Sequence, residues 1–126
     1  MKLLLAIAAG GAIGAVARHL VNVQALAWFG AGFPWGTLTV NVVGSFLMGV
    51  FIESSALMWS PGPALRAMLT VGILGAFTTF STFSLDVAVL YERGQMALAA
   101  AYIVASVLLS IGGLFAGLAL VRALAP

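Results

Sequence analysis

Four long stretches of the sequence are almost entirely apolar, and short segments rich in turn-forming or charged residues separate them. The stretches run approximately over residues 3–25, 36–52, 64–90 and 95–121. A helix needs about 17 to 25 mostly apolar residues to cross the hydrocarbon core of a bilayer. The pattern therefore predicts an all-α membrane protein, with four transmembrane helices in a single domain that occupies residues 1–126.

The first stretch has a second interpretation, because Lys2 and the apolar run after it also have the form of a signal peptide. Against this, Gly10, Gly11 and Gly14 favour a helix that packs closely against another helix. We therefore expect this stretch to remain in the protein as its first span.

Composition supports a lipid environment and excludes several classes of function. Hydrophobic residues make up 63% of the chain and charged residues only 6%, whereas about 25% of the residues of a soluble domain are charged. The formal net charge of +2 provides no basic patch of the kind that binds nucleic acid. Because the chain has no cysteine, disulfides and thiol chemistry are also excluded.

The basic residues give only a weak preference for one orientation in the membrane. With four spans, Lys2, Arg66 and Arg122 lie on one side, and Arg93 lies on the other. Arg18 joins Arg93 if the first span brings it to that side. Positive residues in short loops set orientation, so three against two makes insertion in both directions plausible. An antiparallel pair of chains is then the natural assembly, and a single fixed orientation is the alternative.

Polar side chains inside the apolar stretches are costly in lipid, and their positions are therefore informative. In the second stretch they recur every four residues, which places them on one helical face, and the fourth stretch repeats this spacing. The third stretch has an uninterrupted polar and aromatic run near its middle. The three sets are Thr37, Asn41 and Ser45; Tyr102, Ser106 and Ser110; and residues 78–84, which include Ser81, Thr82 and Ser84.

These sets offer hydroxyl and amide hydrogens without any acid or base, a composition that favours an anion. An ion that leaves water for a medium of low dielectric constant loses about 20 kcal/mol in the idealised limit, and each hydrogen bond to a charged group returns about 1.5 to 3 kcal/mol. Several donors in sequence are therefore required. Phe80 and Phe83 add ring edges, which are partially positive. Two alternatives stay open, because hydroxyl oxygens also serve cations and because such residues also hold helices together.

The third stretch is longer than one straight span requires. From residue 64 to residue 90 a helix extends for about 40 Å, against a hydrocarbon core of about 30 Å. The adjacent Thr78 and Thr79, which follow Gly72 and Gly75, favour a break of this helix in the middle of the membrane. Carbonyl groups freed at such a break can coordinate a cation such as sodium. A tilted, unbroken helix is the alternative.

Three segments of the sequence resemble the Fluc (CrcB) family of fluoride channels. Residues 10–18 read GGAIGAVAR, which is similar to the glycine-rich opening of the family that ends in arginine. Residues 36–46 read GTLTVNVVGSF and are again very similar. The most specific segment is GAFTTFSTFS at residues 75–84. Together the three segments cover three of the four predicted spans.

The resemblance implies a dual-topology homodimer in a bacterial plasma or inner membrane, which exports cytoplasmic fluoride passively through two pores and so relieves fluoride toxicity. It also implies one structural sodium ion at the centre of the dimer, held by the backbone carbonyls of Gly75 and Thr78. Arg18 is expected near a pore entrance, where it draws anions in. The other residues expected along the fluoride pore are Asn41, Phe80, Phe83, Ser81, Thr82, Ser84, Thr37, Tyr102, Ser106 and Ser110, of which the last three rest on spacing more than on motif.

Three residues depart from the pattern of the family. His19 stands where a tyrosine is common, Ala76 where a second glycine is common, and Asp86 where a glutamate is common. None of them removes an expected hydrogen-bond donor. The methyl group of Ala76 does restrict the backbone at the expected sodium site.

Other classes of protein provide rival interpretations. A small multidrug transporter also has four spans, but it needs a carboxylate inside the membrane, and Glu53, Asp86 and Glu92 are expected at the ends of the spans. A structural subunit of a larger complex would use small-residue pairs such as Gly10 and Gly14. An enzyme is not expected, because no histidine and carboxylate pair accompanies a candidate nucleophile.

Overall fold

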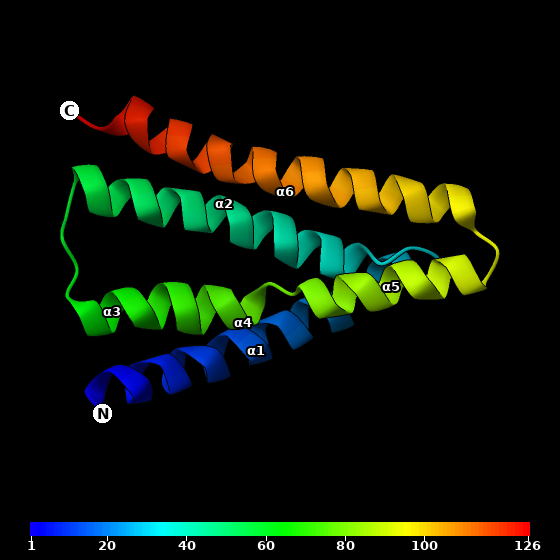
Figure 1. The fold of residues 1–126 in the computed structure, drawn as a ribbon, viewed down its shortest axis with the longest axis horizontal. Helices are drawn as coiled ribbons and strands as arrows, with labels where there is room; N and C mark the ends of the chain where they lie inside the picture. Colours follow the sequence, from blue (N-terminus) through cyan, green and yellow to red (C-terminus); the bar gives the residue numbers. More distant parts are fainter.

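The computed structural model describes residues 1–126 and contains only helices and the segments that connect them (Figure 1). Four helical segments are long and apolar enough to cross a membrane, as the sequence predicts. The elements in chain order are α1 (Lys2–Phe29), α2 (Trp35–Leu57), α3 (Pro63–Ala67), η1 (Met68–Leu74), α4 (Gly75–Phe77), α5 (Phe80–Glu92) and α6 (Met96–Leu124).

The four segments form an elongated bundle in which α3, η1, α4 and α5 follow one another along the third segment (Figure 1). Both termini and the α2–α3 connection lie at one end of the bundle, whereas the α1–α2 and α5–α6 connections lie at the other. Only 19 of the 126 residues are buried in the single chain. Because most residues of this hydrophobic chain remain exposed, its surface carries many large apolar side chains, as expected for a protein surrounded by lipid.

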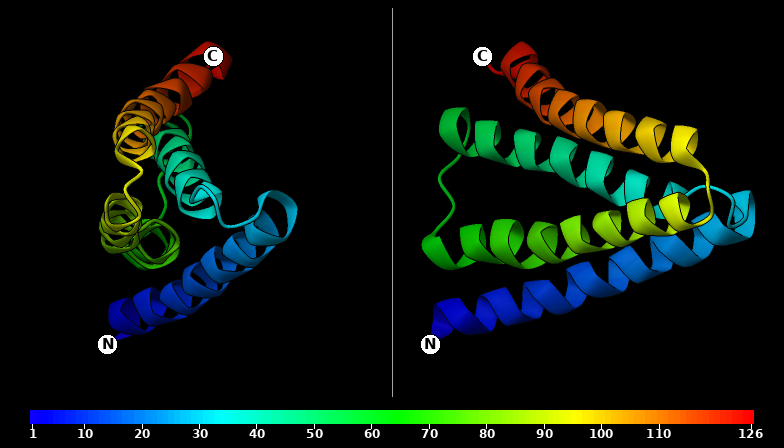
Figure 2. Two further views of the ribbon diagram at one scale, coloured as in Figure 1. Left: turned by 90° about the vertical axis from the view of Figure 1, so that its right-hand side faces the viewer. Right: turned by 45° about the vertical axis from the view of Figure 1, so that its right-hand side comes forward.

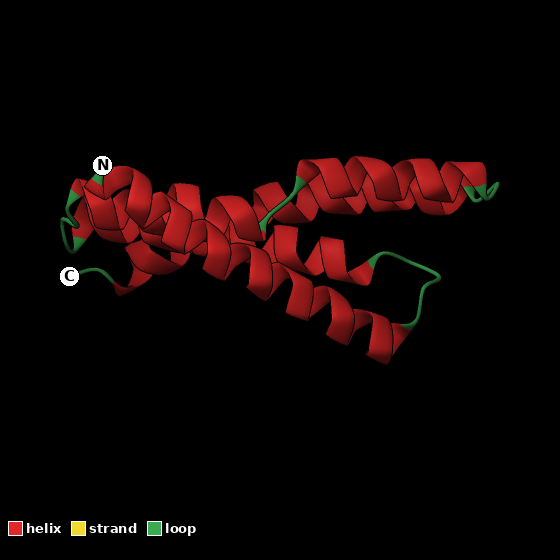
Figure 3. Cartoon of the chain, turned by 90° about the horizontal axis from the view of Figure 1, so that it is seen from below, coloured by secondary structure: helices red, strands yellow, loops and turns green.

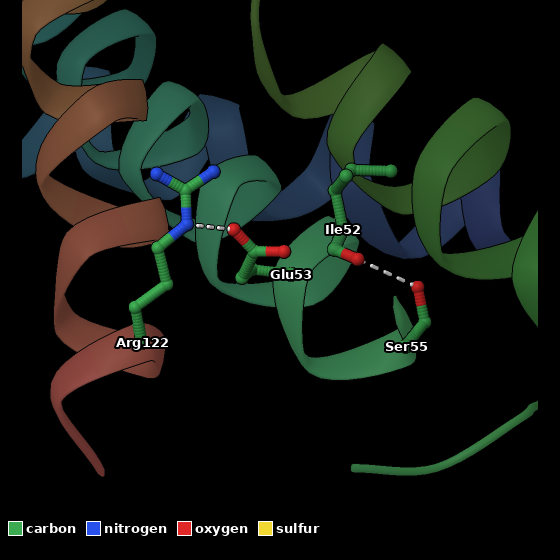
Figure 4. A network of polar contacts seen from close by, with 4 residues as sticks. All are labelled: Ile52, Glu53, Ser55 and Arg122. Atoms are coloured by element: carbon green, nitrogen blue, oxygen red, sulfur yellow. Dashed lines mark hydrogen bonds and ion pairs between the residues drawn. The ribbon is translucent and has the colours of Figure 1, made fainter. Parts of the chain in front are cut away.

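α1 and α2 extend furthest past the apolar stretches that the sequence predicts. α1 continues past residue 25 to Phe29 and stops at Gly30, whose positive φ of 77° suits glycine. α2 continues to Leu57, beyond Glu53, where the apolar run ends. Figure 4 shows why a charge is tolerated there: Arg122 of α6 donates to the Glu53 carboxylate. The sequence predicts an end near residue 52 because hydropathy alone takes no account of this partner.

Glycines determine how closely the helices pack. α2 and α6 make the most extensive helix contact, whereas α1 packs mainly on η1 and less extensively on α2 and α4 (Figure 2). A β-carbon added at Gly49 or Gly117 would overlap a backbone carbonyl oxygen of the opposite helix, α6 or α2. Gly10 and Gly14 of α1 approach the backbone of η1 in the same way. Gly10 and Gly14 of the first span therefore lie on a packing face, whereas nothing lies within 4 Å of a β-carbon added at Gly11.

The third segment is not a continuous α-helix. Residues Met68–Leu74 form the π-helix η1, a feature that the sequence does not predict. Thr78, with ψ of 158°, and Thr79, with φ of −155°, are extended and separate α4 from α5. In Figure 3 a short loop interrupts the helices at this point. We call Thr78 and Thr79 the break.

Candidate functional site

The break lies beside a cavity of about 340 Å³, here called the break cavity. Its wall combines residues from α2, from the break, from α5 and from α6, so three of the four helical segments contribute. The polar and aromatic residues that line it are Asn41, Ser45, Thr78, Thr79, Phe80, Phe83, Ser106 and Ser110. Five of these eight belong to the expected pore, and Thr78 is one of the two residues expected to hold sodium. Ser45 continues the four-residue spacing from Asn41, and that spacing is the signal that identifies it.

Two serine hydroxyls on this wall have no hydrogen-bond partner. The oxygen atoms of Ser106 and Ser110, one helical turn apart on α6, are buried and make no hydrogen bond within the protein. A buried polar group without a partner costs about 1 to 3 kcal/mol. Such groups are rare in folded proteins and point to an absent ligand or water. The break cavity therefore offers two hydroxyl groups that a hydrogen-bonding ligand can contact.

Two phenylalanine rings lie next to these hydroxyls. The centroids of Phe80 and Phe83 are 5.3 Å apart, with 48° between the ring planes. Phe83 is buried, whereas 77% of Phe80 is exposed in the single chain. One wall of the break cavity is thus incomplete, because most of the Phe80 side chain is left uncovered by the same chain.

Asn41 holds the break through two hydrogen bonds. Its Nδ2 atom donates to the Thr79 carbonyl at 3.0 Å, and its Oδ1 atom accepts from the Thr79 backbone N–H at 2.8 Å. An asparagine amide has two hydrogens, so one remains without a partner in the protein. Asn41 therefore fixes the backbone of the break and still has one donor for the cavity that it lines.

The break leaves two backbone carbonyls with free lone pairs. The Thr79 N–H, which in a continuous helix would bond the Gly75 carbonyl, bonds Asn41 instead. No hydrogen bond outside the regular helices has the carbonyl of Gly75 or Thr78 as its acceptor. These are the two carbonyls expected from the sequence to hold sodium, and hard carbonyl oxygens suit such a cation.

A second cavity of about 320 Å³ lies between α1, the α1–α2 connection, α2 and α5, and is here called the loop cavity. Its polar lining includes Asn22, Thr37, Thr82, Asp86 and Arg93. Asp86 lies in the middle of α5. The expectation that it lies at the end of a span is therefore wrong. Its neighbours in the sequence, Leu85 and Val87, are apolar and give no indication that Asp86 lines a polar cavity.

Tyr102 lies between the two cavities. Its side chain is completely buried, and its hydroxyl donates to an Asp86 carboxylate oxygen at 2.9 Å. Its ring contacts Phe33, which lines the loop cavity, and Phe83, which lines the break cavity, with centroid distances of 5.4 and 5.1 Å. Within one chain the expected pore residues therefore surround two cavities separated by aromatic rings, and not one open corridor.

The remaining expected pore residues lie at or near the break. Arg18 lies well inside α1 and donates from Nε to the Ala76 carbonyl at 3.1 Å. The interpretation that groups it with Arg93 at one membrane side is therefore wrong, since α1 continues to Phe29. Ser81 and Ser84 are both exposed, and the Ser84 hydroxyl donates to the carbonyl of Phe80 in its own helix at 3.0 Å.

Comparison with known proteins assigns the chain to a family. The model of the family described as "CrcB-like protein, Camphor Resistance (CrcB)" matches residues 5–118. A relative from Rhodospirillum centenum, described as a fluoride-specific ion channel FluC, is 62% identical over 122 residues, which are 97% of each chain. A relative from Nitrobacter winogradskyi with the same description is 56% identical over 119 residues, 94% of each chain. Because these matches extend over nearly the whole sequence, the chain belongs to the CrcB-like, or Fluc, family of membrane proteins.

Proposed function

We propose that this protein is a passive, fluoride-selective ion channel. The observation that carries the proposal is the pair of unpartnered hydroxyls, Ser106 and Ser110, on the wall of the break cavity. A small anion that accepts hydrogen bonds there removes the penalty of these buried groups. The relatives described as fluoride-specific channels supply the identity of the anion.

Fluoride export follows from the chemistry of the ion. Hydrogen fluoride crosses membranes as a neutral molecule, ionises in a more alkaline cytoplasm and is trapped there as the anion. A membrane potential that is negative inside drives an anion outward through any selective pore, at about 2.3 kcal/mol per charge for each 100 mV. Export therefore needs no nucleotide and no catalytic group, and the protein acts as a channel and not as an enzyme.

The functional unit is a dual-topology homodimer with two pores. In support of this, Phe80 is exposed and leaves the break cavity open, so a second copy is needed to complete the wall. An antiparallel partner, related by a twofold axis in the membrane plane, would complete both copies equally and give one pore for each break. Because Arg18 lies inside α1, one end of the bundle has three basic residues and the other end has only Arg93. The argument for an antiparallel dimer therefore rests on the incomplete cavity wall and not on an equal number of charges at the two ends.

A structural sodium ion fits the carbonyls of Gly75 and Thr78. Two free carbonyls from one chain are too few to coordinate the ion, and two chains related by symmetry provide four. The methyl group of Ala76 does not block this arrangement, because its backbone keeps helical geometry and its carbonyl accepts from Arg18. A sodium ion held by these four carbonyls would offset their partial negative charge and link the two chains.

Exchange of sodium for a large organic cation is expected to weaken the dimer. A ligand that binds only the folded assembly stabilises it by about 2.7 kcal/mol at a concentration 100 times its dissociation constant. The measurement is thermal unfolding of the purified dimer in detergent, at constant ionic strength and increasing sodium fraction. A melting temperature that does not change over this range contradicts the sodium site and leaves the fluoride channel untouched.

Flux from liposomes tests the proposed function. Purified protein is reconstituted into vesicles loaded with fluoride or chloride, a potassium gradient with valinomycin sets the potential, and an ion-selective electrode records efflux. Rapid efflux of fluoride without chloride is the expected result. Proton-coupled exchange of an organic cation would instead identify a small multidrug transporter, and silence in both assays would identify a structural subunit.

Replacement of Ser106 or Ser110 with alanine is expected to separate conduction from stability. Loss of one hydrogen bond to a charged ion slows flux by about tenfold or more. Stability is expected to stay the same or to rise, because the change removes a buried group that has no partner. Ser55→Ala is the matched control, since this buried hydroxyl donates within its own helix to the Ile52 carbonyl (Figure 4). Equal flux in all three variants would contradict a role of the serine hydroxyls.

A further inference from the structure

A short chain of hydroxyl groups at the break ends beside Arg18. The Thr79 hydroxyl donates to the Thr82 hydroxyl at 3.2 Å, and a second nitrogen of Arg18, Nη1, donates to the same Thr82 oxygen at 3.4 Å. The Ser81 hydroxyl lies 3.3 Å from that of Thr79. The chain connects the two cavities, since Thr79 lines the break cavity and Thr82 lines the loop cavity.

The direction of these hydrogen bonds can be assigned from the number of protons and lone pairs. A hydroxyl has one proton and two lone pairs. The Thr79 oxygen accepts from the Thr82 backbone N–H at 3.1 Å, which caps α5, and its own proton goes to the Thr82 oxygen. The Ser81 hydroxyl can then only donate to Thr79. The proton of Ser81 is therefore engaged by Thr79, although the family resemblance implies that Ser81 lies along the pore.

The Thr82 hydroxyl is left with a free proton. Its two lone pairs accept from Thr79 and from Arg18, and no hydrogen bond from its own proton to another protein atom is present. Because Thr82 lines the loop cavity, that proton is available to a guest there. Arginine has donors but no acceptor, so Arg18 fixes this direction. If position 18 held a residue that does not donate to Thr82, the Thr82 hydroxyl could turn its proton toward Thr79 and its lone pairs toward the cavity.

Arg18 is held in place for this task by the end of the preceding half-helix. Its Nε atom donates to the Ala76 carbonyl at 3.1 Å, and the break leaves this carbonyl without the backbone donor of a continuous helix. A cation at the C-terminal end of a helix is also favoured by the helix dipole. The planar guanidinium group then directs Nη1 to Thr82 in a fixed geometry.

We propose that Arg18 is a positioning residue that orients the Thr82 hydroxyl proton into the loop cavity, where it binds fluoride on entry. The inference rests on the proposed channel function and adds a donor site ahead of the break cavity. Arg18 acts on the anion through Thr82, beyond the general attraction of its positive charge. This makes the hydroxyl of Thr82, and not that of Ser81, the donor that the polar run supplies to the anion.

A double-mutant cycle tests the inference. Arg18→Gln, Thr82→Val and the double variant are reconstituted, and the fluoride concentration for half-maximal flux is measured together with the maximal rate. Arg18→Gln alone is expected to raise the half-saturating concentration by about tenfold, the effect of one lost hydrogen bond to a charged ion. In the Thr82→Val background the same change is expected to have less than about a twofold effect, because the two residues form one unit.

Arg93→Gln is the matched control for charge. Arg93 also lines the loop cavity, but its guanidinium donates to the Ala31 carbonyl and does not touch the hydroxyl chain. Its loss is expected to produce only a change that disappears at high salt, with the same size in the Thr82→Val background. The effect of Arg18→Gln is expected to persist at high salt.

Two results would overturn the inference. Equal fold-changes for Arg18→Gln in the presence and in the absence of Thr82 would show that Arg18 acts by charge alone. A salt dependence that matches that of Arg93→Gln would show the same. If Arg18→Gln does not fold, as judged by thermal unfolding in detergent, Arg18→Lys keeps the charge without the planar fork and enters the same cycle. Absence of fluoride flux in the unmodified protein would instead overturn the proposed function itself.

Discussion

Gly14→Ala is expected to prevent formation of the native bundle, whereas Gly11→Ala, three residues earlier on the same helix, is expected to be tolerated. A β-carbon at Gly14 would overlap the Ile73 carbonyl oxygen and lie 3.0 Å from its carbonyl carbon. The atoms that it meets belong to the backbone of η1, which cannot rotate away as a side chain can. At Gly11 nothing lies within 4 Å of the added carbon.

The expected effect at Gly14 is large because the contact is between two backbones. Overpacking with one extra carbon typically costs about 1 to 3 kcal/mol when side chains can adjust, and we expect at least the upper value here. Gly11→Ala is expected to gain up to about 1 kcal/mol from helix propensity. Thermal unfolding in detergent and the yield of folded protein measure both variants. Equal stability of the two variants would mean that α1 does not pack on η1 as described.

The glycines of α1 also pack against the π-helix that precedes the break. Gly10 approaches the Met68 carbonyl at the start of η1, and Gly14 approaches Ile73 near its end. A π-helix widens the turn locally and is often found at functional sites. α1 therefore packs closely on the segment immediately before the break. One turn further along α1, Arg18 donates a hydrogen bond to the carbonyl of Ala76 in α4. Packing and polar contacts from α1 thus reach both the π-helix and α4, the two elements that precede the break.

The sequence predicts the number and approximate position of the spans because lipid imposes a simple rule on length and hydropathy. It also favours a break of the third span at Thr78 and Thr79, since adjacent β-branched residues after glycines disfavour a helix, and both residues have extended backbone in the structure. The π-helix is not predicted, because the apolar pattern of Met68–Leu74 does not distinguish i→i+5 hydrogen bonds from those of an α-helix. Helix ends past Glu53 are missed because the partner Arg122 is far away in the sequence.

Most of the expected pore residues line one of the two cavities, yet their individual contacts depend on the tertiary structure. Spacing by four correctly places Asn41 and Ser45 on one face of α2, where both line the break cavity. The same spacing cannot show that Thr37 lines the other cavity, or that the hydroxyl of Tyr102 is engaged by Asp86. A sequence pattern identifies which groups are polar, whereas the direction of each proton depends on neighbours from other helices.

Asn41→Ala is expected to disable the break and to abolish fluoride flux. The change removes both hydrogen bonds to Thr79 and leaves its N–H and carbonyl without partners in a partly buried position. Each unpaired group costs about 1 to 3 kcal/mol, so the two together cost about 2 to 6 kcal/mol if the break keeps its geometry. The extended Thr79 is then expected to rearrange, and the free carbonyls of Gly75 and Thr78 lose their positions.

Asn41→Asp and Thr39→Ala make this prediction specific. Aspartate keeps an acceptor for the Thr79 N–H but brings a carboxylate oxygen against the Thr79 carbonyl, so only one of the two contacts survives and an anion is repelled. Thr39 donates at 2.7 Å to the Trp35 carbonyl of its own helix and is exposed, and its replacement is expected to change stability by less than about 0.5 kcal/mol. Flux in liposomes and melting in detergent are measured for all three variants. If Asn41→Ala conducted fluoride as well as Thr39→Ala does, the paired hydrogen bonds at the break would have no part in forming the pore.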